Sequence, residues 1–362
     1  MKSVPLYQQI ANHLREQILS GKLRPGDRVP SEKELAQYFN VSQITSKQAL
    51  AVMSDENLVV RIKGKGTFVA GRNGTDILHS IHSGFKGIVG IIFPSITMPV
   101  ESLLFFRLQS RLHERGYQTL IRVTEDKMEK EIEAIRMFQL FGVRGFVIFP
   151  VMEEHYNEEI LKLSLDKTPH VLVDRYLPNI TNSSVTSENI QGTLEAMDYL
   201  FRQGHEHIAL LNQESRNSNT HERALGFERA FLDRQLPIDK KYWLYLKRTS
   251  RADDERVKQQ IAAFFKANPH VTAVFAVDTV LARLAYAALG EMGRRVPQDV
   301  ALVSFDDPKL PFVPYIQQDI DTIADKAVEL IIEQMEGTYV PRRETVPVKF
   351  VADVGYPTPE GL

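Results

Sequence analysis

Residues 30–69 carry the strongest structural signal in the sequence, because they read as two short capped helices joined by a turn and followed by a hairpin. Ser31 and Glu34 have the spacing of a capping box, in which each side chain bonds to the other residue's backbone amide. Asn40 suits the turn after the first helix, since asparagine tolerates left-handed backbone geometry. Ser42 stands where it can cap a second helix. The pattern predicts a helix-turn-helix.

A hairpin with a basic tip is predicted after the second helix. β-Branched residues at 58–61 and 67–69 favour two short strands, and Lys63-Gly64-Lys65-Gly66 lies between them. The outward positions of the second helix are Gln43, Ile44, Lys47 and Gln48, and the inward ones are Ala49, Leu50 and Met53. A helix fits the major groove of DNA, and a thin cationic tip fits the minor groove. Helix pairs of this shape also occur in proteins that do not bind DNA. Two capped helices followed by this hairpin, which we call the wing, favour DNA binding.

The motifs PSEKELAQYFNVS, TSKQAL and GKGTFV resemble the winged helix-turn-helix of GntR-family bacterial regulators over residues 1–70. The resemblance implies DNA contacts at Arg28, Lys33, Ser42, Gln43, Thr45, Lys47, Lys63 and Gly64. The sequence departs from the family pattern at Gln43, where arginine is usual, and at Ser46, where a larger apolar residue is usual. Glutamine can pair with adenine through two hydrogen bonds. Gln43 therefore predicts an altered base preference, together with the loss of a possible phosphate contact.

The charge distribution agrees with an N-terminal DNA-binding domain, which we call the head, joined to a larger domain of another function, which we call the body. Residues 1–72 hold 11 Lys and Arg against 6 Asp and Glu, whereas residues 73–362 hold 33 against 40. A basic segment joined to an acidic one is typical of such proteins. Within the head, Leu6, Ile10, Leu14 and Ile18 recur every four residues, which predicts a further helix packed on the helix-turn-helix.

Several classes of protein and site are excluded by what the sequence lacks. The chain has no cysteine, which excludes disulfides, thiolate metal sites and cysteine nucleophiles. It has no signal peptide and no run of about 18 apolar residues, so we expect a soluble cytoplasmic protein without a membrane partner. Residues 71–86 are rich in Gly, Ser, Thr and Asn, which predicts a linker. His79 and His82 have no third ligand nearby, so no metal site is expected there.

From Gly87 onward the sequence alternates apolar strands with amphipathic helices, which predicts parallel sheets covered on both faces. The strands are expected at 88–93, 119–123, 146–150, 170–174, 208–212, 242–246, 273–278 and 300–305. A helix at 321–336 and one last strand at 344–351 follow. Two series of four strands predict two lobes in a domain spanning 87–362. We assign 87–175 plus 317–336 to one lobe, and 176–316 plus 337–362 to the other.

The body lacks the sequence motifs of common cofactor sites and catalytic sites. The first strand is not followed by the G-x-G-x-x-G turn of dinucleotide sites, and no P-loop or G-x-S-x-G elbow is present. No spaced set of His, Asp and Glu predicts a metal centre. Polar residues instead follow several strands, at the edge where parallel sheets bind ligands. Carboxylates and arginines gathered there favour a pocket for a polar ligand such as a sugar.

The segments VLVDR, GHEHIALLN, HERALGFERAF and VPQDVALVSFDD resemble the effector domain of LacI/GalR-family regulators, which is similar to periplasmic sugar-binding proteins. The resemblance implies that a sugar-like effector contacts Ser95, Glu101, Met152, Arg175, Arg223, Phe227 and Asp278. The family often has aromatic residues where Val100 and Glu101 stand, and asparagine where Val277 stands, so the identity of the sugar is not implied. A GntR-like wing replaces the LacI-type head, as in arabinose repressors of Gram-positive bacteria.

The two resemblances together imply a homodimeric repressor that a sugar, such as an arabinose-like pentose, releases from double-stranded operator DNA. No cofactor and no catalytic residue are expected. Two alternatives remain open at this point: a sugar-binding receptor without DNA activity, and a regulator with a non-sugar effector such as a purine. An enzyme acting on the sugar has no positive support in the sequence.

Overall fold

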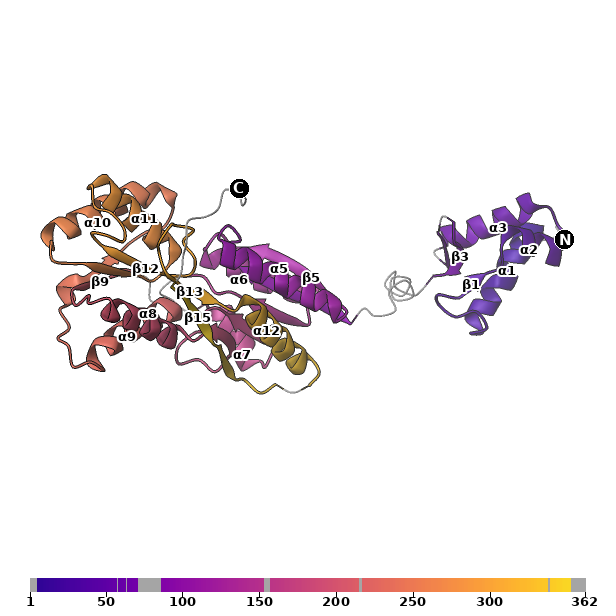
Figure 1. The fold of residues 1–362 in the computed structure, drawn as a ribbon. Coiled ribbons are helices and arrows are strands. Elements are labelled where there is room, and N and C mark those ends of the chain that lie inside the picture. The colour runs from indigo at the N-terminus through magenta and orange to yellow at the C-terminus, as the bar shows by residue number, and fades with distance from the viewer. Residues whose placement is uncertain are drawn as a thin grey trace. The chain divides into compact units, whose positions relative to one another are not determined.

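The computed structural model describes residues 5–352 apart from 57, 63, 71–85, 153–156, 215–216 and 338. The chain divides into two compact units, Met1–Phe85 and Lys86–Leu362, which are described separately (Figure 1). The predicted linker, except for Lys86, and the His79–His82 pair lie outside the described residues. No described helix is long and apolar enough to span a membrane.

The first unit is a three-helix bundle with a small antiparallel sheet. Its elements are α1 (Leu6–Leu19), β1 (Arg28–Val29), α2 (Glu32–Tyr38), α3 (Gln43–Asp55), β2 (Val59–Ile62) and β3 (Gly66–Val69). The sheet has the order β1-β3-β2, so the predicted hairpin gains a third short strand. The apolar stripe of α1 packs through Ile10 and Leu14 on Leu35, Ala49 and Met53 of the other two helices. This shared core sets the angles between the helices.

The local signals predicted for this unit are confirmed. The Glu34 amide donates to Ser31 Oγ at 3.3 Å, and the Ser31 amide donates to a Glu34 carboxylate oxygen at 2.6 Å. Asn40 has a φ of 50° in the turn between α2 and α3. Ser42 caps α3 by accepting the Thr45 amide at 3.2 Å. Helices α2 and α3 therefore begin where a serine side chain satisfies an exposed backbone amide.

The second unit contains two sheets, and the first is entirely parallel. Its strands are β4 (Gly87–Phe93), β5 (Tyr117–Val123), β6 (Gly145–Ile148), β7 (His170–Val173), β8 (Ser183–Ser187) and β14 (Arg343–Val346). They have the order β14-β8-β7-β6-β4-β5. One face packs on α5 (Pro99–Glu114) and α12 (Ile320–Met335). The other packs on α6 (Met128–Leu140) and α7 (Glu158–Leu165).

The second sheet is parallel except for its last strand. Its strands are β9 (Ile208–Gln213), β10 (Trp243–Leu246), β11 (Ala273–Ala276), β12 (Ala301–Phe305), β13 (Tyr315–Gln318) and β15 (Val348–Val351). They have the order β10-β9-β11-β12-β13-β15, and β15 is antiparallel to β13. The flanking elements are α8 (Asn189–Arg202), α9 (Ser218–Leu232), η1 (Lys240–Tyr242), η2 (Arg251–Asp253), α10 (Asp254–Ala267) and α11 (Thr279–Glu291). Helices α8 and α9 cover one face, and α10 and α11 the other (Figure 1).

The predicted assignment of residues to the two lobes is wrong at β8, at β14 and at the end of β13. Residues 317–318 were assigned to the first lobe, but they lie in β13 of the second sheet. β8 and β14 belong to the first sheet, although residues 176–316 and 337–362 were assigned to the second lobe. The strand predicted at 344–351 is two strands, because Pro347 has no amide with which to continue a ladder. The chain passes from one sheet to the other at Pro347, so β14 and β15 pair in different lobes.

Candidate functional site

The N-terminal turn of α3 presents polar side chains to solvent from a rigid base. Ser42, Gln43 and Lys47 are exposed, whereas Thr45 is half-buried and its hydroxyl lies 2.8 Å from that of Ser42 in the cap. Ser46 is fully buried and donates to the Glu32 carbonyl in α2 at 2.7 Å. This bond joins α3 to α2. The outward side chains therefore have a defined direction.

Other elements of the first unit also carry exposed cations. Arg28 lies in β1 and Lys33 in α2, and both side chains are exposed, as is Gly64 at the wing tip. Gly64 has a φ of 79°, a backbone conformation that favours glycine. Lys63 lies outside the described residues. Within the described part of the chain Lys33 and Lys47 form no ion pair, so their charges are available to phosphate groups.

The second unit gathers polar side chains at the carboxyl ends of both sheets. Strand order reverses at β4 in the first sheet and at β9 in the second, and parallel sheets bind ligands beside such reversals. The loops and helices that follow these strands place several polar side chains at the carboxyl ends of the sheets, and we call these side chains the polar cluster. Its charged members are Glu101, Asp174, Arg175, Glu222, Arg223, Asp278 and Asp306. Asp174 and Asp306 are not among the effector contacts predicted from the sequence.

Arg175 is buried directly after β7. Its Nη1 donates to the Pro150 carbonyl at 2.9 Å, and its guanidinium lies 4.8 Å from the Phe149 ring centroid. Its Nε is 3.7 Å from an Asp174 carboxylate oxygen and has no hydrogen-bond partner among the described residues. A buried donor without a partner is costly. This N–H is therefore a group that a ligand oxygen can satisfy.

Arg223 is the central cation of the cluster. It is only 3% exposed, donates from Nε to Asn189 Oδ1 at 2.9 Å, and donates from Nη1 to the Val277 carbonyl at 2.7 Å. Its guanidinium lies 3.5 Å from the centroid of Phe305. Burial lowers the pKa of Arg223, although the Asp306, Asp174 and Asp278 carboxylates oppose that shift. The structure thus places Arg223, a predicted effector contact, among these carboxylates.

Asp278 and Asp306 face Arg223 from the second sheet. One Asp278 oxygen caps α11 by accepting the Val280 and Leu281 amides, each at 2.8 Å, and the other accepts Gln213 Nε2. Burial raises the pKa of Asp306 to about 6, against the lowering effect of the Arg223 guanidinium. Gln318 Nε2 lies 3.0 Å from both Asp306 oxygens. Asp278 is thus largely engaged in the helix cap, whereas Asp306 gains or loses its proton near pH 6.

The first lobe supplies Ser95 and Glu101 after β4. Glu101 accepts the Met98 amide at 3.2 Å at the start of α5, and Ser95 Oγ also bonds to its carboxylate. Burial raises the pKa of Glu101, whereas those hydrogen bonds and Arg175 lower it. Ser95 is further tied to Thr97, whose hydroxyl lies 2.8 Å away. Glu101 therefore lies close enough to Arg175 for the guanidinium to lower its pKa.

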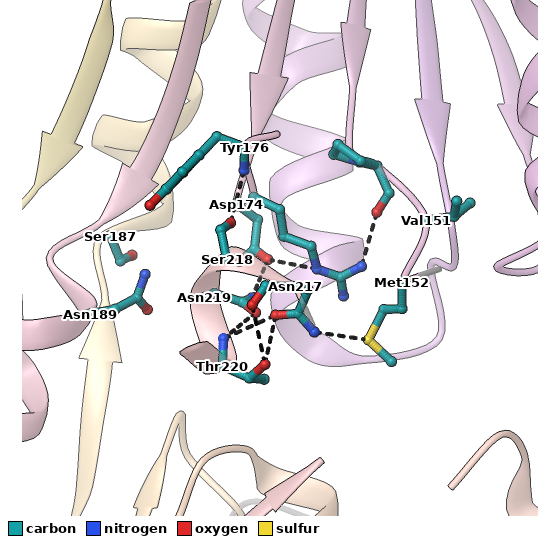
Figure 2. Close-up of polar contacts among 12 residues, drawn as sticks. Val151, Met152, Asp174, Tyr176, Ser187, Asn189, Asn217, Ser218, Asn219 and Thr220 are labelled. Carbon is teal, nitrogen blue, oxygen red and sulfur yellow. Dashed lines mark hydrogen bonds and ion pairs between the residues drawn. The ribbon is translucent and has the colours of Figure 1, made fainter. Parts of the chain in front are cut away.

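Direct contacts join the two lobes beside these groups. Figure 2 shows Asp174, Tyr176 and Met152 of the first-lobe loops facing the start of α9. Asn219 Nδ2 donates to Asp174 at 2.7 Å, the Tyr176 amide donates to Ser218 Oγ at 2.9 Å, and Asn217 Nδ2 lies 3.5 Å from Met152 Sδ. The sequence prediction missed the group Ser187, Asn189, Asn217, Ser218, Asn219, Thr220, Glu222 and Gln318. The N-cap spacing of Asn217 and Thr220 was the one available signal.

Phe227, a predicted effector contact, packs in the hydrophobic core. Phe227 is 1% exposed and belongs to the core of the second lobe, where its ring lies 6.3 Å from Phe275 and 5.9 Å from Trp243. It follows Arg223 by one helical turn, and its ring contacts other aromatic residues of that core. Among the described residues no three His, Cys, Asp or Glu side chains are grouped to hold a metal ion.

Comparison with known proteins identifies both units. Residues 6–69 match bacterial regulatory proteins of the gntR family, and residues 197–352 match the periplasmic binding protein-like domain. The chain joins a GntR-family DNA-binding domain to a periplasmic binding protein-like domain. This confirms the predicted fold class, a winged helix-turn-helix followed by a two-lobed α/β domain. The chain is a DNA-binding transcriptional regulator.

Several known proteins match this chain over most of their own length. The arabinose metabolism transcriptional repressor of Geobacillus stearothermophilus is 26% identical over 92% of this regulator and 90% of its own length. The protein of the same name from Halalkalibacterium halodurans is 25% identical over 90% and 86%. A LacI-family transcriptional regulator from Enterococcus faecium, solved with bound ribose, superposes with a TM-score of 0.61 at 23% identity, covering 75% of this chain and 99% of that one. This last likeness concerns the fold of the second unit.

Proposed function

We propose that this regulator is a homodimeric repressor that a neutral sugar, bound at the polar cluster, releases from a palindromic operator. The observation that carries the proposal is the convergence of side chains from both lobes on Arg223 in a chain with a DNA-binding head. A ligand held between two lobes changes their relative position when it binds or leaves. Two heads joined through their second units would sense that change as altered spacing.

The charges of the polar cluster favour an uncharged, hydroxyl-rich ligand. Asp174, Asp278 and Asp306 outnumber Arg175 and Arg223, so a phosphate or carboxylate group would meet net repulsion. Carboxylates accept hydrogen bonds from hydroxyl groups, and guanidinium groups donate to them. The names of the relatives support a sugar, since two are arabinose metabolism repressors and a third was solved with ribose.

The energetics of such a switch are modest. Coupling of about 1–3 kcal/mol between ligand and DNA changes operator affinity roughly 5- to 150-fold. Pairing two heads raises affinity by effective concentration without any new contact. We propose that the protein acts in the cytoplasm, where its operator is accessible, and that it has no catalytic role.

The test is operator binding by the full-length protein across a panel of pentoses, hexoses and their phosphates. The operator is sought as a palindrome upstream of the protein's own gene. We expect one neutral sugar to weaken binding at least fivefold. The Arg223→Lys variant should bind the operator but lose the response, because lysine cannot reproduce the two directed bonds of the guanidinium. Arg229→Lys, an exposed position on the same helix, is the matched control and should respond normally.

Three outcomes would contradict the proposal. Release only by a purine would indicate a non-sugar effector for the same site. Sugar binding without any DNA binding at low salt, where electrostatic attraction is strongest, would indicate a receptor. Chemical conversion of the sugar by the pure protein would indicate an enzyme.

A further inference from the structure

Ile44 occupies an unusual place on the DNA-binding helix α3. It is 79% exposed, whereas Leu50 of the same helix is 6% exposed. Successive helix positions are about 100° apart, so Ile44 lies opposite the direction shared by the buried residues Ser46, Ala49 and Met53. The Ser46 bond to α2 fixes that orientation. Ile44 therefore stands at the middle of the outward face, in the first turn of the helix.

The surroundings of Ile44 suit a nucleic acid rather than an apolar protein surface. Gln43, Lys47 and Gln48 beside it are exposed, as is Lys33 in α2. Within the described part of the chain none of these four side chains forms an ion pair or a side-chain hydrogen bond. An exposed isoleucine adds nothing to the core and has a lower helix propensity than glutamine or lysine. Its large apolar side chain lies among cations that attract phosphate groups.

We propose that Ile44 recognises the C5-methyl group of a thymine in the major groove, at a base pair adjacent to the one that Gln43 contacts. The thymine methyl is the apolar group that base pairs present in this groove, so it is the partner that an isoleucine can match. Gln43 and Ile44 are neighbours in the first helical turn, and the amide of Gln43 can pair with adenine. The inference rests on the DNA-binding function and specifies which base contacts set the operator sequence.

The size of the effect follows from the apolar surface removed from water. Burying one methyl group changes a binding constant about fourfold. Replacing the thymine with deoxyuridine removes only that methyl group and keeps every hydrogen-bonding edge. Wild-type protein should then lose about fourfold in affinity at one thymine of each half-site. A variant without the isoleucine side chain should be indifferent to the same replacement.

The experiment uses full-length protein and an operator selected from a randomised duplex library. Each thymine in one half-site is replaced in turn by deoxyuridine, and affinity is measured by fluorescence anisotropy at one salt concentration. Ile44→Ala should bind the unmodified operator more weakly and lose the deoxyuridine effect at that one position. Leu6→Ala removes another exposed apolar side chain, from α1, and should keep both the affinity and the deoxyuridine pattern of the wild type.

The outcomes separate this inference from the function on which it rests. Selection of no sequence by the wild-type protein would contradict DNA recognition itself. Selection of an operator whose deoxyuridine pattern is the same for wild type and Ile44→Ala would overturn the role of Ile44 alone. Loss of the pattern in Ile44→Ala, with helix content unchanged by circular dichroism, would support it.

Discussion

Asp306 is a residue of the polar cluster whose charged form lowers the stability of the fold but can accept hydrogen bonds from a ligand. Its pKa is raised to about 6 from an ordinary value of 3.8, because burial penalises its charged form. A carboxyl group with a raised folded-state pKa stabilises the fold while it is protonated, and that contribution is lost as the pH rises through about 6. The charged Asp306 is therefore a cost at neutral pH, which a ligand hydroxyl group can offset.

We predict that Asp306→Asn removes this pH dependence. Between about pH 4.5 and 7.5 the free energy of unfolding of the wild type should fall by about 2 kcal/mol relative to that of the variant. The variant should thus be the more stable protein at neutral pH, while losing effector response. Urea unfolding followed by fluorescence of Trp243, the single tryptophan, reports on the second lobe. Parallel pH profiles for the two proteins would contradict the assignment.

Individual residues of the site were predictable where one local pattern defined them. Arg223 and Asp278 follow apolar strands, and the structure brings both to the polar cluster. For Phe227 the sequence reveals that it lies near Arg223 but not that its ring packs in the core. Asn219 was missed because its partner Asp174 is in the other lobe, and a single sequence contains no signal for that contact.

The strand β8 links the two lobes and gives a test at the level of one element. Ser187 Oγ donates to Gln318 Oε1 at 2.6 Å, which joins β8 of the first sheet to β13 of the second. Ser184, on the same strand, has a buried hydroxyl without a hydrogen-bond partner among the described residues. The two serines are chemically identical and both are buried, so they form a matched pair.

We predict opposite outcomes for alanine at these two positions. Ser187→Ala should lower the free energy of unfolding by about 1–3 kcal/mol, because it leaves the Gln318 oxygen buried and unpaired. Ser184→Ala should leave stability unchanged or slightly increased, since it removes a polar group that gains nothing from burial. Urea unfolding followed by circular dichroism measures both. Equal losses at the two positions would mean that the Ser187 bond contributes no stability.

The same strand explains the limits of prediction at the level of elements. The strands rich in valine, isoleucine and leucine were found because an uninterrupted apolar run predicts a buried strand. β8 reads SSVTS and β13 reads YIQQ, so neither has such a run. The division of the last strand at Pro347 was available in the sequence, because proline interrupts a ladder. Which sheet each half joins depends on contacts between distant segments.

At the level of the whole molecule, the proposed function requires that a change within the second unit alters the affinity of the first unit for DNA. If the ligand acts by altering the spacing of two heads, it has no effect on a single head. Operator binding through two heads should then respond to the sugar, and binding through one head should not. This difference separates a spacing mechanism from one in which the sugar alters the DNA-contacting surface itself.

We predict that a duplex with a single half-site binds at least about 100-fold more weakly than the palindrome, because the second contact is no longer intramolecular. The sugar should weaken binding to the palindrome roughly 5- to 150-fold and leave half-site binding unchanged. Anisotropy titrations of both duplexes at one low salt concentration keep the weaker complex measurable, since phosphate contacts strengthen as salt falls. Arg223→Lys should show no sugar effect on either duplex. If the sugar weakens the half-site complex as much as the palindrome complex, the sugar acts on the head itself or on its connection to the second unit, because a single head would then respond without a partner.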